Sequence, residues 1–121
     1  MMTKQEILEI VNNIHASIPE RLTGNEEIAI ITERLQSIVL EERQTMIEVL
    51  RDWISVRIPE NQRKKDDGKK EGTLYLALEV AKKYSLKELR PDIEALIADI
   101  HSGKTYLPYY EEMIAKYLNY L

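Results

Sequence analysis

Residues 25–58 contain neither proline nor glycine, and their apolar residues keep helical spacing throughout. Spacing of three and four residues places the apolar side chains on one face of a helix. As a single helix the stretch would be roughly 51 Å long, at about 1.5 Å per residue. Helices in globular proteins average about 11–12 residues, so we favour a break near residues 41–44 over one continuous helix.

Further helices are predicted on both sides of this stretch. Thr3 with Glu6, and Thr23 with Glu26, have the spacing of a capping box, in which the threonine hydroxyl and the glutamate each satisfy a free backbone amide. No segment alternates in the way typical of a strand. The fold class is therefore all-α, with five to six antiparallel helices. The first predicted helix begins at residue 3 and ends near residue 17. Three later helices are predicted over residues 73–84, 90–101 and 108–120.

Three residues mark helix boundaries in the last third of the chain. Ser85 precedes Glu88 by three residues and is expected to cap the segment that follows it. Pro91 is tolerated in a first helical turn, so the regular helix is expected to begin at residue 90 or 91. Gly103 is typical of a residue that ends a helix.

The chain is expected to form a single domain over residues 1–121, with one charged linker inside it. N-terminal helices occupy residues 1–58, the linker PENQRKKDDGKKEG occupies residues 59–72, and further helices occupy residues 73–121. So polar a run favours a solvated loop. The alternative is an electrostatic contact for an acidic partner.

The composition argues against several kinds of chemistry. The chain has no cysteine, which excludes disulfides, thiolate nucleophiles and cysteine-ligated metals. His15 and His101 have no second histidine at ligand spacing, so no metal is expected. There is no glycine-rich phosphate loop and no nucleophile elbow, so we expect neither a cofactor nor an enzyme. The first residues resemble neither a signal peptide nor an anchor, and we expect a cytoplasmic protein.

Charge is distributed unevenly along the chain. The net charge is -4. Residues 1–56 carry five basic and ten acidic groups, residues 57–72 carry six and four, and residues 73–121 carry six and seven. The acidic front half favours a basic protein partner over nucleic acid or an anionic membrane.

Tyrosine is concentrated towards the C-terminus. All seven tyrosines lie at or beyond Tyr75, and the chain has no phenylalanine. Helical spacing assigns Tyr110 and Tyr117 to the core. Tyr106, Tyr109 and Tyr120 remain as candidate partner-binding residues, since tyrosine packs like an apolar residue and still hydrogen-bonds at a wet edge. The alternative is that they border the core with their hydroxyls in water.

An acidic row is predicted on the penultimate helix. Glu88, Asp92 and Asp99 share the side away from the apolar residues of that helix. Ordinary solvation is the favoured interpretation. The functional alternative is that the row binds lysines or arginines of a basic protein.

Residues 74–121 resemble one and a half HEAT-like units. The residues that carry the match are Leu74, Leu78, Ala81, Leu89, Pro91, Ile93, Leu96 and Ile97. Small, acidic, cysteine-free helical proteins of this kind resemble the immunity proteins of bacterial polymorphic-toxin and contact-dependent growth inhibition systems. The resemblance implies a non-enzymatic protein that binds and neutralises a toxin domain, often a nuclease.

Two other function classes stay open from the sequence. One is a structural or regulatory homo-oligomer that uses its tyrosine edge against a second copy, so a monomer and a homodimer are both allowed. The other is an enzyme or nucleic-acid binder built on helical repeats. The second requires a basic groove with aromatic platforms, and the only basic excess here is the small one in the linker.

Overall fold

A computed structural model describes residues 1–59, 69–105 and 111–121 of the chain. Within these ranges it contains helices and no strands, so the predicted all-α class is confirmed. The α-helices are α1 (Lys4–Ala16), α2 (Gly24–Arg34), α3 (Gln36–Glu41), α4 (Arg43–Ile54), α5 (Lys69–Lys83), α6 (Arg90–His101) and α7 (Glu111–Tyr117). Two 3-10 helices, η2 (Lys87–Leu89) and η3 (Leu118–Tyr120), precede α6 and follow α7.

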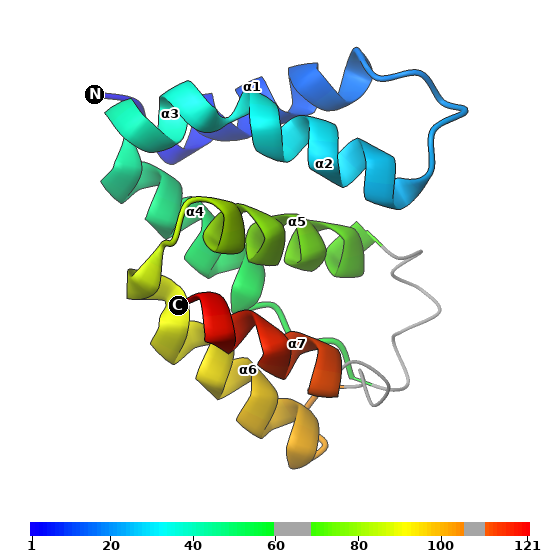
Figure 1. Cartoon of the computed structure of the whole chain (residues 1–121), viewed down its shortest axis with the longest axis vertical. Coiled ribbons are helices and arrows are strands. Elements are labelled where there is room, and N and C mark those ends of the chain that lie inside the picture. The colour runs from blue at the N-terminus through cyan, green and yellow to red at the C-terminus, as the bar shows by residue number, and fades with distance from the viewer. Residues whose placement is uncertain (60–68, 106–110) are drawn as a thin grey trace.

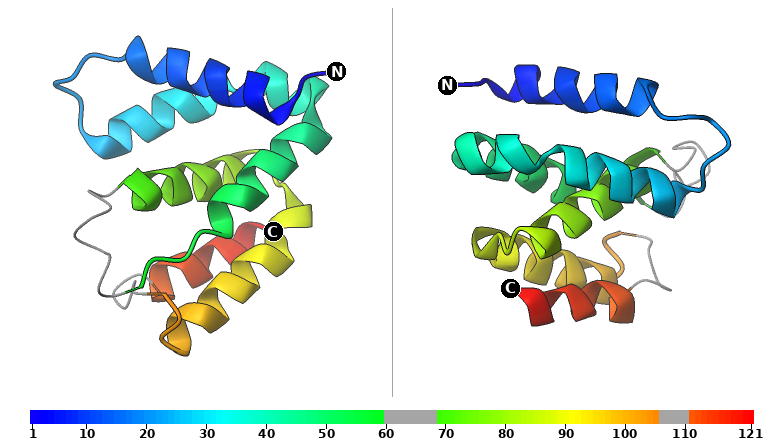
Figure 2. Two further views of the ribbon diagram at one scale, coloured as in Figure 1. Left: turned by 180° about the vertical axis from the view of Figure 1, so that it is seen from behind. Right: turned by 45° about the horizontal axis from the view of Figure 1, so that its top comes forward.

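The helices stack in three tiers along the long axis of the molecule (Figure 1). The first tier holds α1 with α2 and α3, the second holds α4 and α5, and the third holds α6 and α7 (Figures 1 and 2). Helix α5 packs against α2, α4 and α7, and α4 packs against α1, α5 and α6. The middle tier therefore holds the two outer tiers together.

One cluster of buried apolar residues runs through all three tiers. It begins at Ile7 on α1 and extends to Ile114 on α7, and both side chains are fully buried. The largest side chains that are fully buried between these two are Leu35, Met46, Ile47, Leu50, Ile54, Leu78, Leu86, Leu89, Ile93 and Leu96.

The long proline-free stretch is broken twice rather than once. The predicted break near residues 41–44 is confirmed at Glu42, where ψ is 42°. A second break at Leu35, which was not predicted, separates α2 from α3, and the described residues hold seven α-helices instead of five to six. Leu35 is fully buried, so the turn at this residue lets α3 follow the core where a straight helix would leave it.

Both predicted capping boxes are present. The backbone amide of Glu6 donates to Thr3 Oγ1 at 3.2 Å, and the amide of Glu26 donates to Thr23 Oγ1 at 3.2 Å. In each case the glutamate side chain accepts in return from the threonine amide. Helix α1 ends at Ala16, next to the expected end at Ser17.

Helix α5 begins inside the segment that was assigned to the linker. The linker was expected to reach Gly72, but α5 starts at Lys69 and contains Gly72. The lysines and the glutamate around Gly72 are good helix formers, and they offset a glycine cost of about 1 kcal/mol. Residues 60–68 of the linker lie outside the described residues. The predicted start of the last helix at residue 108 also lies outside them, and α7 is described from Glu111.

The expectation that Ser85 caps the next segment is wrong. Ser85 has a φ of 51°, and it ends α5 instead. The backbone amide of Leu86 donates to the Ala81 carbonyl at 3.0 Å, as in a Schellman motif. Gly103, with a φ of 82°, ends α6 in the same way, as predicted, through an amide of Lys104 that donates to the Asp99 carbonyl at 2.9 Å.

Ser85→Gly is expected to raise the free energy of unfolding by about 0.5 kcal/mol, because glycine has no Cβ to clash in the left-handed conformation. Gly103→Ala is expected to lower it by about 1 kcal/mol for the same reason. Urea denaturation of both variants measures the two changes. A Ser85→Gly protein that is less stable than the wild type would contradict the assignment of Ser85 to this helix end.

Candidate protein-binding grooves

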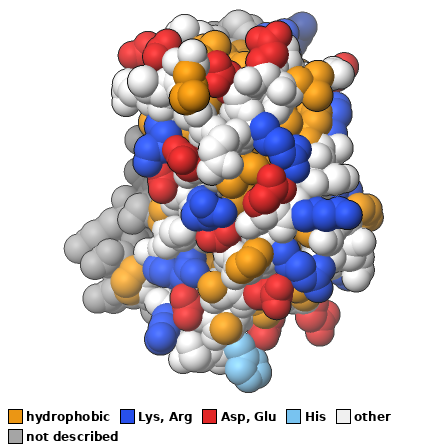
Figure 3. Space-filling model, turned by 90° about the vertical axis from the view of Figure 1, so that its left-hand side faces the viewer, with side chains coloured by type: hydrophobic (Ala, Val, Ile, Leu, Met, Phe, Trp, Pro, Cys, Tyr) orange, Lys and Arg blue, Asp and Glu red, His pale blue; other side chains and the backbone are white. Residues whose placement is uncertain are grey.

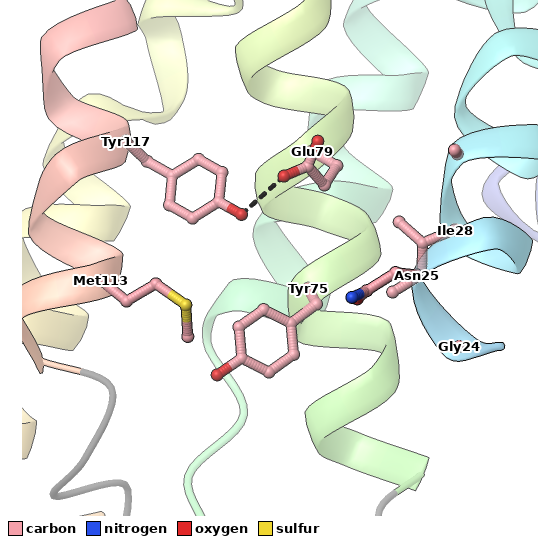
Figure 4. Close-up of a pocket in the computed structure, with 8 residues that line it drawn as sticks. Gly24, Asn25, Ile28, Tyr75, Glu79, Met113 and Tyr117 are labelled. Carbon is pink, nitrogen blue, oxygen red and sulfur yellow. Dashed lines mark hydrogen bonds between the residues drawn. The ribbon is translucent and has the colours of Figure 1, made fainter.

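A cavity of about 690 Å³ lies between α2, α5 and α7 (Figure 4). We call it the tyrosine groove. Each helix lines it with residues four apart, which share one helix face. The lining residues are Gly24, Asn25, Ile28 and Ala29 of α2, Tyr75 and Glu79 of α5, and Met113 and Tyr117 of α7.

A tyrosine–glutamate hydrogen bond crosses the tyrosine groove. The Tyr117 hydroxyl donates to Glu79 Oε1 at 2.7 Å (Figure 4). Burial, together with this bond, raises the pKa of Tyr117 far above its ordinary value of 10.0, so the hydroxyl stays neutral. Within the described part of the chain, Glu79 forms no ion pair with a lysine or an arginine. Among the described residues, the groove therefore holds a carboxylate that no lysine or arginine pairs with.

The rest of the tyrosine groove suits apolar side chains of a protein partner. The Tyr75 ring points from α5 into the space between α2 and α7, near Met113 (Figure 4). Met113 is 41% exposed although it is a large apolar residue. Methionine adapts its shape to different partners, and tyrosine adds apolar area with a polar tip.

A second cavity, of about 510 Å³, lies between α1, α2 and α5. We call it the glycine groove, because Gly24 and Gly72 both line it. Gly24 and Ile28 belong to both grooves, so the N-terminal half of α2 separates them. On one rim, His15 Nδ1 of α1 forms an ion pair with Glu27 Oε1 of α2. The remaining lining residues are Val11, Asn12, Ile31, Thr73 and Leu76.

The predicted acidic row is paired with arginines of the same chain. Each of its three carboxylates accepts from an arginine that lies on α4 or just after it, at 41 to 45 residues' separation. The row was expected to be solvated or to receive a partner's cations, and its pairing with these arginines was not predicted. We call the set the arginine ladder. Its pairs are Arg43–Glu88 at 2.8 Å, Arg51–Asp92 at 3.2 Å and Arg57–Asp99 at 2.8 Å.

The arginine ladder joins the second tier to the third. Arg57 also donates to the Ile54 and Val56 carbonyls, at 2.7 and 3.1 Å, and so satisfies the end of α4. Basic and acidic side chains are interspersed on the side of the molecule shown in Figure 3. Since the ladder carboxylates already have cationic neighbours, they are weaker candidates for a partner's cations than Glu79. Binding of a partner by Glu88, Asp92 and Asp99 stays a prediction.

The arginine ladder is expected to make stability depend on acid pH. The hydrogen bond from Arg43 lowers the pKa of Glu88 below 4.5, and that from Arg57 lowers the pKa of Asp99 below 3.8. A carboxyl whose pKa is lower in the folded than in the unfolded state stabilises the fold above its unfolded pKa. That contribution is lost as the pH falls below about 5 and through the folded pKa values.

Urea midpoints measured between neutral pH and about pH 3 test this dependence. Glu88→Gln/Asp99→Asn is expected to lower the midpoint at neutral pH and to make its fall with acid shallower. Glu48→Gln is the control, because Glu48 is exposed and lies outside the ladder. An equally steep fall in the double variant would contradict the role of these two carboxyls.

The predicted tyrosine edge is described only in part. Tyr120 is 52% exposed, and Lys82 Nζ lies 4.6 Å from the centre of its ring. Tyr106 and Tyr109 lie outside the described residues, as does Tyr110, which was assigned to the core. Tyr117, also assigned to the core, is half-buried and lines the tyrosine groove. The groove thus uses Tyr75 and Tyr117, whereas Tyr120 does not line it.

The acidic charge of the front half lies on the first tier. Residues 1–42 carry three basic and eight acidic groups, and residues 43–56 carry two of each. The net charge of -5 therefore belongs to α1, α2, α3 and the segments that join them. Both grooves are lined by α2, so both open beside this acidic tier.

The chain was compared with protein-family models, with curated proteins and with solved structures, and none of the three comparisons gives a match. Residues 1–59, 69–105 and 111–121 contain no group of three histidine or acidic side chains placed to hold a metal ion. None of the helices in these ranges is both long and apolar enough to cross a bilayer. The two grooves and the charge around them are the features of this chain that bear on its function.

Proposed function

We propose that this chain is a non-enzymatic protein-binding module that receives a basic partner in the tyrosine groove. The observation that carries the proposal is the Glu79 carboxylate, which faces a neutral tyrosine hydroxyl inside a groove lined by aromatic and methionine side chains. A partner's lysine or arginine can supply the missing cation. Apolar side chains beside that cation can pack on Tyr75 and Met113.

More specifically, we propose an immunity protein that binds and neutralises a basic toxin domain of nuclease type. The acidic first tier would attract such a domain from a distance, because complementary charge mainly raises the association rate. The aromatic residues of the groove would then hold it, since buried aromatic anchors dominate the energy of most interfaces. On the basis of the stacked helix tiers we also propose a HEAT-like antiparallel arrangement of the C-terminal half, whose α5 and α7 would form two walls of the tyrosine groove.

Co-expression with the neighbouring gene product tests the proposed immunity function. The two proteins are expected to co-purify, and this chain is expected to rescue growth when the neighbour is toxic. The immunity proposal fails if the neighbour is harmless alone and the two never co-purify.

Met113→Arg tests the tyrosine groove itself. It places a cation where apolar side chains of the partner are expected to pack, beside the position of the partner's own cation. The affinity for the partner should therefore fall by at least about tenfold. Leu40→Arg is the matched control, because Leu40 is 73% exposed on α3 and lines neither groove. Affinity that falls equally in both variants, or in neither, would contradict binding in this groove.

The second candidate function is a homo-oligomer that buries the C-terminal end. Among the described residues, Met113 and Tyr120 are large apolar side chains that are exposed within one short stretch, on α7 and η3. Sedimentation of the wild type and of Tyr109→Ala/Tyr120→Ala distinguishes this function from the first. A wild type that stays monomeric at high concentration excludes it.

A further inference from the structure

We propose that the glycine groove is a second docking site for the same basic partner, which seats an apolar side chain there beside a lysine or arginine that pairs with Glu27. This inference rests on the proposed function for the class of partner. The glycine groove would be a site separate from the tyrosine groove. In it, Glu27 would select a cationic side chain, and the partner chain would approach the backbone of α5 closely.

The floor of the glycine groove is apolar. Val11, Ile31 and Leu76 are between 4% and 8% exposed, and they come from three different helices. Ile28 is half-buried and forms the wall shared with the tyrosine groove. A cavity of about 510 Å³ with such a floor can bury one large apolar side chain of a partner.

The fold does not require the two glycines that line this groove. Neither Gly24 nor Gly72 has the positive φ that favours glycine, and a Cβ added to either would meet no atom within 4 Å. Gly72 lies within α5, where glycine is the least favoured residue after proline. The absence of both side chains leaves the groove open and lets another chain approach the backbone of α2 and α5.

The rim of the glycine groove carries an acid, Glu27, that has no permanently charged partner in the part of the chain that the structure describes. Among the described residues, Glu27 forms an ion pair only with His15, and histidine is charged only when protonated. The carboxylates of the arginine ladder, in contrast, face arginines, which are always charged. A lysine or arginine of a partner can therefore displace His15, whose side chain is 63% exposed.

The charge of the tier that supplies α1 and α2 to the groove favours a basic partner over a second copy of this chain. Residues 1–42, which include α1 and α2, carry a net charge of -5. Two such tiers placed face to face would repel each other. A basic amphipathic segment supplies both the cation for Glu27 and the apolar side chain for the floor.

A pair of fluorescent amphipathic peptides tests the inference on the full chain. One peptide has leucines on one face and lysines on the other, and its counterpart carries glutamates in place of the lysines. Fluorescence anisotropy is expected to show binding of the leucine–lysine peptide, weakened by salt, and none of the leucine–glutamate peptide. Equal binding of the two peptides, or no binding of either, overturns the inference.

Three variants locate the site of binding. Gly72→Leu fills the groove and is expected to reduce affinity at least about tenfold while the melting temperature stays level or rises, since leucine favours a helix. Glu27→Gln should weaken binding severalfold. His15→Ala should strengthen it, because it leaves Glu27 without its present partner. Ala98→Leu, on the exposed side of α6, is the control for added apolar surface.

Failure of this inference is distinguishable from failure of the proposed function. If Met113→Arg weakens peptide binding and Gly72→Leu does not, the glycine groove is not a site while the tyrosine groove stands. If neither variant weakens binding, both proposals fail. If His15→Ala weakens binding as much as Glu27→Gln does, the proposal that the partner's cation displaces His15 is wrong.

Discussion

Leu78→Ala is expected to lower the free energy of unfolding by about 2–5 kcal/mol, the largest effect of a single substitution considered for this chain. Leu78 is fully buried on α5, the helix that packs against α2, α4 and α7. Truncation removes apolar contacts within the core cluster and leaves a cavity that a close-packed core fills only in part. Domains have about 5–15 kcal/mol of stability in total, so the variant should be only marginally folded.

Urea denaturation followed by circular dichroism measures this loss. Leu40→Ala is the matched control, because it makes the same chemical change at a side chain that is 73% exposed. Its effect should stay within about 0.5 kcal/mol. Similar losses at Leu78 and Leu40 would contradict the central position of α5.

Thr105→Val is expected to lower the free energy of unfolding by about 1–3 kcal/mol. Thr105 is 3% exposed, and its hydroxyl accepts a hydrogen bond of 2.9 Å from the Ile58 backbone amide. This contact joins the segment after α4 to the segment after α6, across 47 residues of sequence. Valine has nearly the same shape but cannot accept, so the buried amide of Ile58 would lose its partner.

Thr105→Ser separates the hydrogen bond from the packing. Serine keeps the hydroxyl and loses one methyl group, which should cost only about 0.8 kcal/mol. Hydrogen exchange of the Ile58 amide should accelerate in the valine variant and stay slow in the serine variant. A serine variant less stable than the valine variant would show that the methyl group matters more than the hydroxyl.

Much of the fold could be predicted because its signals are local. A capping box needs only residues three apart, and both threonine–glutamate pairs are present as expected. The break at Leu35 could not be predicted, because it depends on where the core lies relative to a helix that has no glycine or proline. The start of α5 at Lys69 was not predicted, because the polar composition of the segment is typical of a loop although lysine and glutamate favour helices.

The grooves could not be predicted, because they depend on contacts between distant segments. The residues that line the tyrosine groove range from Gly24 to Tyr117 in the sequence. The spacing of residues along one helix does not predict which distant helix will lie beside it. A weak signal did exist: Tyr75 with Glu79 and Met113 with Tyr117 are four residues apart, so each pair shares a face. The acidic row was predicted on the penultimate helix, but Glu88 lies on η2, and the arginines that pair with the row lie more than 40 residues earlier in the sequence.

The central position of α5 has a consequence for synthesis of the chain on the ribosome. The apolar faces of α2 and α4 are covered by α5, which begins only at Lys69. A nascent chain that ends before Lys69 carries half of the core residues, and the faces of α2 and α4 that α5 covers are then exposed. Translation adds about 5–20 residues per second, so these faces stay open for seconds, in which general chaperones can bind them. Slowing translation downstream of α4 should lengthen this period and increase aggregation of the newly made protein.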